Sequence, residues 1–109
     1  MPAYVIVGVD VDDADAYSTY ARDVPATLEP FGGRFLVRGG EWSQLEGEWP
    51  SSRIVVLEFP SVEQATAWHE SPEYQAILPI RQQNATTHFM VAVDGAGPGT
   101  PDPNVKPAT

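Results

Sequence analysis

The sequence predicts a small α+β domain, on the basis of three observations. Runs of strand-like composition alternate with segments of helical periodicity over residues 3–93. The chain has 109 residues, a length that suits one domain. Residues 95–109 are dominated by glycine and proline, so they cannot form a regular element. We therefore expect a folded domain over residues 1–94 and a tail over residues 95–109. A disordered end is favoured over an arm that lies on a partner chain.

The first part of the chain predicts a strand followed by a helix. Residues 3–9 are mostly β-branched or aromatic and stop at an acidic cluster, which is typical of a strand. Apolar side chains then recur every three or four positions from Tyr17 to Phe31, which indicates one face of a helix. Pro25 and Pro30 are expected to kink or shorten this helix, because proline lacks an amide donor. The glycines after Phe31 end it.

Two further strands are expected in the middle of the chain. Residues 34–38 alternate, with Arg34 and Arg38 on one face, and the following pair of glycines suggests a bulge. Residues 41–52 read as a continuation of this strand into a long hairpin loop. Residues 53–59 give the clearest strand of the chain.

Two helix starts and a last strand complete the pattern. Ser61 with Gln64 has the form of a capping box, and Ser71 followed by a proline gives a second start signal. Pro79 leaves the end of that second helix open. Residues 88–93 predict the final strand.

The order of these elements is a split βαβ arrangement, which predicts a ferredoxin-like fold with a four-stranded antiparallel sheet and its helices on one face. The first and third strands are apolar on both faces, whereas the uncovered sheet face of a monomer is expected to carry polar side chains. We therefore expect a homodimer that packs through the uncovered sheet face. The rival interpretation, that the hairpin with Trp42 and Trp49 covers this face of its own chain, is less favoured because one loop is small for the task.

Composition excludes several partners and settings. The formal net charge of −9 argues against nucleic acid and anionic membranes as partners. The chain has no cysteine, which excludes disulfides, thiolate zinc sites and cysteine nucleophiles. No leader and no apolar run of spanning length are visible, so the expected compartment is the cytoplasm.

Four runs of the sequence resemble one family in order. They are residues 32–40 (GGRFLVRGG), 45–50 (LEGEWP), 58–61 (EFPS) and 71–75 (SPEYQ). Together they resemble the bacterial domain-of-unknown-function family thirteen-thirty, within the dimeric α+β barrel superfamily, over roughly residues 2–93. The resemblance implies a ferredoxin-like protomer that pairs with its twin, and it brings no settled reaction, cofactor or catalytic residue. His69 and Pro79 depart from the family pattern.

The candidate pocket residues are those expected between the sheet and the helices or next to that space. They are Tyr17, Tyr20, Arg34, Arg38, Glu58, Trp68, His69, Tyr74 and Arg81.

Core packing is the favoured interpretation of the three tyrosines and the tryptophan in this set. For Glu58 an ion pair with Arg34 or Arg38 is favoured over a base of raised pKa. Solvent exposure is favoured for His69, and also for Arg81, which is the candidate partner of a carboxylate ligand.

No metal site is expected, because helix capping explains the acidic cluster at residues 10–15. No cofactor is expected either.

Three functional hypotheses remain open. The first is a domain that binds a small hydrophobic or aromatic molecule between sheet and helices, with an oxygenase or isomerase as its enzymatic form. This hypothesis requires a cavity of roughly 300 Å³ or more. The second is a non-catalytic structural or interaction dimer, in which Glu58 is paired and aromatic rings fill the space. The third is a haem enzyme, which requires an imidazole that faces a wide cavity.

Overall fold

The computed structural model describes residues 1–96 and confirms the predicted α+β class. The elements in chain order are β1 (Ala3–Val11), α1 (Ala14–Leu28), the 3₁₀ helix η1 (Glu29–Phe31), β2 (Arg34–Arg38), β3 (Arg53–Phe59), α2 (Val62–Glu70), α3 (Pro72–Asn84) and β4 (Ala85–Asp94). Most of the predicted tail, from residue 97 onward, lies outside the described residues.

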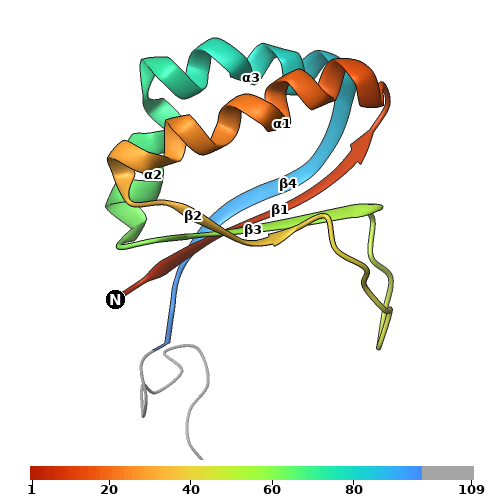
Figure 1. Ribbon diagram of the computed structural model, residues 1–109. Coiled ribbons are helices and arrows are strands. Elements are labelled where there is room, and N and C mark those ends of the chain that lie inside the picture. The colour runs from red at the N-terminus through yellow and green to blue at the C-terminus, as the bar shows by residue number, and fades with distance from the viewer. Residues whose placement is uncertain (97–109) are drawn as a thin grey trace, which may run out of the picture.

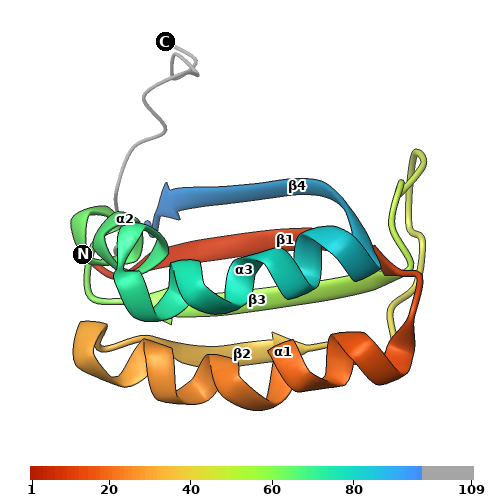
Figure 2. The same cartoon turned by 90° about the horizontal axis from the view of Figure 1, so that it is seen from above.

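The four strands form one antiparallel sheet in the order β2-β3-β1-β4. In the central pair, Val5 of β1 lies opposite Leu57 of β3. The helices cover one face of the sheet (Figure 1), and α1 and α3 run side by side across it (Figure 2). This is the ferredoxin-like arrangement that the element order predicts.

Side-chain caps start the three α-helices, two of them at the predicted residues Ser61 and Ser71 and one within the acidic cluster at residues 10–15. The side chains of Asp13, Ser61 and Ser71 accept hydrogen bonds from backbone amides in the first turns of α1, α2 and α3. Pro25 lies inside α1 and Pro79 inside α3, and neither ends its helix. Each proline removes only one backbone bond, and burial of the helix face offsets that loss. None of the described helices is long and apolar enough to cross a membrane.

The core lies between the helices and the sheet, around Trp68. This residue of α2 is 1% exposed, and its ring lies 4.2 Å from that of Tyr74 and 5.3 Å from that of Phe59, centroid to centroid. Its indole N–H donates to the Thr27 hydroxyl of α1 at 3.0 Å. One side chain therefore joins β3 to all three α-helices.

The sheet face that the helices leave uncovered, called the open face below, carries apolar side chains from the three strands β1, β3 and β4. Val91 and Val93 of β4 are 48% and 47% exposed, and they lie opposite Ile6 and Tyr4 of β1. Ile6 in turn lies opposite Val56 of β3. Much of this face is thus apolar and accessible in the single chain.

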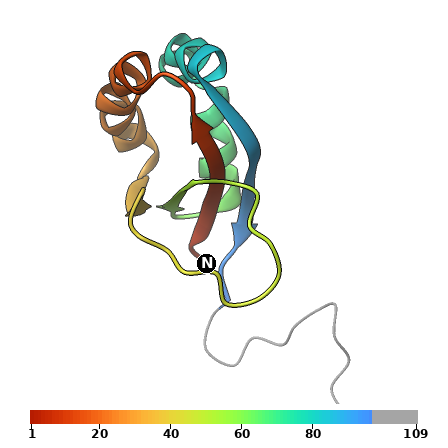
Figure 3. The ribbon, with the colours of Figure 1, turned by 90° about the vertical axis from the view of Figure 1, so that its right-hand side faces the viewer.

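The loop at residues 39–52 covers one end of the open face and forms no continuation of β2 (Figure 3). Its Trp49 ring packs at nearly a right angle on Phe89, with 5.1 Å between centroids. Gly8 lies beneath, where a Cβ atom would come within 2.6 Å of the Phe89 ring and of the Ser51 hydroxyl. The loop therefore covers the open face only around Phe89. The two valines of β4, Val91 and Val93, stay exposed.

A bulge in β2 corrects one prediction. Phe35 lies opposite Leu57 while Val37 lies opposite Val56, so Leu36 is an extra residue in the strand. Arg34 consequently lies on the open face, and Arg38 lies on the helix face opposite Val55. The expectation that both arginines share a face is wrong because strict alternation fails at a bulge, and the bulge that was predicted at the two glycines lies here instead.

We predict that Leu57→Ala lowers the free energy of unfolding by about 2 to 5 kcal/mol, because it leaves a cavity beneath the helices. Urea unfolding followed by circular dichroism measures this change. The matched control is Leu45→Ala, since Leu45 is 89% exposed and its truncation should change stability by less than about 0.5 kcal/mol. Equal effects of the two variants would contradict the described core.

Candidate functional site

A half-open cleft lies between α1 and the helix face of the sheet and is the candidate site. Aromatic side chains from three elements form much of its wall: Tyr17, Tyr20, Phe35 and Trp68. Three arginines from β2, β3 and α3 also line it: Arg38, Arg53 and Arg81. No carboxylate is among the lining residues, although the chain carries a net charge of −9.

The enclosed part of this cleft is small, with a volume of about 30 Å³. One or two water-sized groups fit in such a space. The sequence-based hypothesis of a ligand pocket called for roughly 300 Å³, and the cleft in this conformation does not reach it. The buried rings of Tyr17, Trp68 and Tyr74 occupy much of the layer between sheet and helices.

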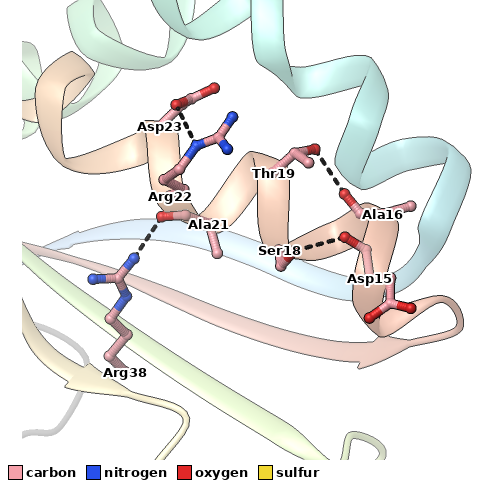
Figure 4. A network of polar contacts seen from close by, with 8 residues as sticks. All are labelled: Asp15, Ala16, Ser18, Thr19, Ala21, Arg22, Asp23 and Arg38. Carbon is pink, nitrogen blue, oxygen red and sulfur yellow. Dashed lines mark hydrogen bonds and ion pairs between the residues drawn. The ribbon is translucent and has the colours of Figure 1, made fainter.

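The mouth of the cleft is bridged by a contact that Pro25 makes possible. In an α-helix the amide of residue 25 would bind the carbonyl of Ala21, but proline has no amide hydrogen. The guanidinium of Arg38 takes that place, and its Nη2 donates to the Ala21 carbonyl oxygen at 2.5 Å (Figure 4). A side chain of β2 therefore closes over the cleft through one hydrogen bond, which can break without unwinding α1.

Tyr20 and Arg81 lie at the floor of the cleft, and Tyr74, which does not line the cleft, is fully buried behind them. The hydroxyls of Tyr20 and Tyr74 lie 2.8 Å apart and share a hydrogen bond. Burial is the main cause that raises the pKa of Tyr20, followed by the neighbouring Tyr74. Arg81 is only 6% exposed, so the prediction that it is solvated is wrong. Its spacing from Tyr74 and Leu78 places all three on the buried stripe of α3.

Arg34 and Glu58 lie on the open face, away from the cleft. The Arg34 Nη2 lies 2.8 Å from Glu58 Oε1, which confirms the favoured ion pair. The alternative, that Glu58 is a base in the space between sheet and helices, is wrong, because neighbouring Leu57 is the residue that points toward the helices.

His69 is half-buried beside the floor and does not line the cleft. Its ring centroid lies 5.4 Å from that of Tyr74, and it borders a separate groove of about 210 Å³ between α2 and β4. Burial first, and then the charge of Arg81, lower the pKa of His69. The imidazole therefore faces a shallow groove, and the favoured interpretation of full exposure does not hold.

His88 takes part in anchoring the loop at residues 39–52. Its Nε2 lies 2.7 Å from Oδ2 of Asp10, whose other carboxylate oxygen accepts a hydrogen bond from the backbone amide of Ser52 at 2.6 Å. These contacts join β4, β1 and the end of the loop.

Eight residues that line the cleft are absent from the set predicted from the sequence: Val7, Ala21, Val24, Phe35, Arg53, Val55, Leu57 and Met90. A signal for Arg53 existed, because it alternates with Val55 and Leu57 on the buried face of β3. No local signal identifies Ala21, since its role depends on Arg38 approaching from another element.

A family model described as "Domain of unknown function (DUF1330)" matches residues 2–96. Among solved structures, RPA0582 from Rhodopseudomonas palustris, a protein of unknown function, is similar with a TM-score of 0.68 and 20% identity, over 89% of this chain and 84% of that one. HapK from Hahella chejuensis is similar with a TM-score of 0.60 and 19% identity, over 92% and 98% of the two chains. No curated protein matches the sequence. At these identities the likeness shows the fold.

The contacts of Asp10 predict a pH dependence of stability. Hydrogen bonds from His88 first, and then from Ser52, lower the pKa of the Asp10 carboxyl from 3.8 to about 2. A carboxyl whose pKa is lower in the folded state stabilises the fold above its unfolded pKa, and this stabilisation is lost as the pH falls toward 2. We expect Asp10→Asn to lower the Tm above pH 4, and the difference from the wild type to vanish near pH 2.

Thermal unfolding between pH 2 and pH 7, followed by circular dichroism, measures this difference. Glu48→Gln neutralises an exposed carboxylate of the loop that Asp10 anchors and serves as the control. A Tm difference for Asp10→Asn that stays constant over the whole range would contradict the assignment.

Proposed function

This chain belongs to the DUF1330 family, whose function is unknown, and from its geometry we propose that it binds a small apolar or aromatic molecule in the cleft between α1 and the sheet. The observation that carries the proposal is the lining, in which four aromatic rings and three guanidinium groups meet without a carboxylate. Rings of this kind supply apolar contact area, and a few polar groups among them orient a ligand.

Entry of a ligand requires the cleft to open at its mouth. The bridge from Arg38 to Ala21 supports this step, because a solvent-exposed arginine can leave one carbonyl oxygen for water at a small cost in free energy. The ring of Phe35, 4.2 Å from the Arg38 guanidinium carbon, lies at the same mouth. Opening there would widen the access from solvent to the enclosed space of about 30 Å³.

The second candidate function is a non-catalytic interaction dimer. The small enclosed volume and the paired Glu58 favour it over an enzyme. Neither the haem hypothesis nor the oxygenase and isomerase forms gain support from His69, which lies outside the cleft.

Self-association through the open face is part of both candidates. Val91, Val93, Ile6 and Val56 form an apolar surface that a second copy of the same sheet would bury. A two-fold axis lets the same patch serve both partners. The helix side, with its cleft, stays accessible in such a dimer.

We predict that Val91→Lys shifts the protein from dimer to monomer, because it places a charge within the apolar surface, next to Ile6. Light scattering coupled to size-exclusion chromatography measures the mass. Leu45→Lys places the same charge on an exposed leucine outside this surface and should leave the mass unchanged. A wild-type mass of one chain, or equal masses for the two variants, would count against self-association through the open face.

The ligand proposal is tested by blocking the mouth of the cleft. We expect Ala21→Trp to weaken binding of small aromatic probes at least ten-fold, because the indole would occupy the entrance. Ala26→Trp adds the same bulk at an exposed position of α1 and should bind like the wild type. Chemical-shift perturbation with phenylacetate and phenylacetamide measures both affinities. No perturbation around the cleft with either probe would support the non-catalytic dimer.

A further inference from the structure

Arg81 is a buried cation without an anion. It is 6% exposed, and in the described part of the chain no carboxylate pairs with it: the ion pairs there involve Arg22, Arg34 and His88. A charge taken out of water normally pairs with an opposite charge, because its desolvation is costly. The position of Arg81 at the floor of the cleft therefore needs an explanation.

The hydrogen bonds of Arg81 leave part of its guanidinium unused. Its Nη1 donates to the hydroxyl of Thr87, and its Nη2 contacts the weakly accepting sulfur of Met90 at 3.7 Å. Its Nε is buried and has no partner among residues 1–96. Neutral partners satisfy two of the nitrogen atoms, and the third N–H is available to an acceptor.

The tyrosine pair next to Arg81 has a free donor as well. Two hydroxyls that lie 2.8 Å apart use one of their two hydrogens between them, so either Tyr20 or Tyr74 keeps an O–H that donates elsewhere. The guanidinium of Arg81 interacts with both hydroxyls, but arginine only donates hydrogen bonds, so it cannot accept the remaining O–H. The guanidinium carbon of Arg81 is 5.9 Å from the centre of the Tyr20 ring, so both donors belong to one buried cluster.

A second guanidinium with an unused donor lies on the cleft wall. Arg53 of β3 packs over the Tyr17 ring at 5.8 Å, and its Nε is likewise buried without a partner among the described residues. Donors thus outnumber acceptors throughout the cleft. This excess suits a ligand that brings negatively charged oxygen atoms.

We propose that the cleft binds an organic monocarboxylate, whose oxygens accept hydrogen bonds from Arg81 and from the free hydroxyl of the Tyr20–Tyr74 pair. This inference rests on the proposed function, that the cleft binds a small molecule. The enclosed space of about 30 Å³ suits a carboxylate head. The apolar or aromatic body lies toward the mouth, against Tyr17 and Phe35.

The first experiment compares acids with their amides, which match in shape and lack the charge. Benzoate, phenylacetate and hexanoate are titrated against benzamide, phenylacetamide and hexanamide at pH 7, with affinities from calorimetry or chemical shifts. We expect each acid to bind about 10- to 100-fold more tightly than its amide, the ratio that corresponds to one hydrogen bond to a charged group. Equal affinities of acid and amide would overturn the carboxylate assignment and leave the proposed function standing. Failure of all six probes to bind would overturn both.

The second experiment removes the donors. Arg81→Met should lower the affinity for phenylacetate about 10- to 100-fold and change that for phenylacetamide less than about three-fold. Arg22→Met, which removes an exposed guanidinium of α1, is the matched control and should bind both probes like the wild type.

A third variant keeps the inference testable if Arg81→Met fails to fold. The double variant Tyr20→Phe/Tyr74→Phe retains both rings and removes both hydroxyls. It should weaken phenylacetate binding about ten-fold and leave phenylacetamide binding unchanged. An unaltered preference for the acid in this variant would exclude the tyrosine pair from the site.

Discussion

The indole of Trp68 ties the helices to the sheet, and the cleft exists because of where this ring sits. It contacts Phe59 and Tyr74 and donates to Thr27, so the sheet and three helices share one anchor. On one side of the ring the space between the layers is filled by large side chains. On the other side lies the cleft, where rings and arginine side chains leave an enclosed space of about 30 Å³ and the packing remains incomplete. A partly open cleft and a well-packed core therefore coexist in this small domain.

The distribution of charge gives the two faces of the sheet different properties. The bulge at Leu36 sends Arg34 to the open face, where Glu58 neutralises it, and sends Arg38 to the cleft, where it meets only a carbonyl. An acidic protein thus keeps an arginine-lined cleft, because its carboxylates lie elsewhere on the surface. The open face is therefore largely apolar, while the cleft on the helix side carries guanidinium groups without carboxylate partners among the described residues.

Proline has a comparable local effect in α1. Pro25 removes one amide, and the carbonyl of Ala21 that loses its partner becomes the acceptor that holds Arg38 over the mouth of the cleft. From the sequence, Pro25 was expected to kink or shorten the helix. In the structure the helix continues through it, and the free carbonyl supplies the contact.

The amino-acid sequence alone predicted the order of the strands and helices, the helix caps at Ser61 and Ser71, and an apolar pattern on both faces of the central strands. These features depend on neighbouring residues, so periodicity and capping reveal them. The spacing of Arg81 from Tyr74 and Leu78 also indicates a buried position, although the prediction for Arg81 was solvent exposure. The folded chain alone shows that a bulge in β2 places Arg34 and Arg38 on opposite faces of the sheet. It also brings the hydroxyl of Tyr20 to that of Tyr74, which lies 54 positions further along the chain. Such contacts depend on strand register and helix packing, which set the distances between residues far apart in sequence, and no local pattern encodes them.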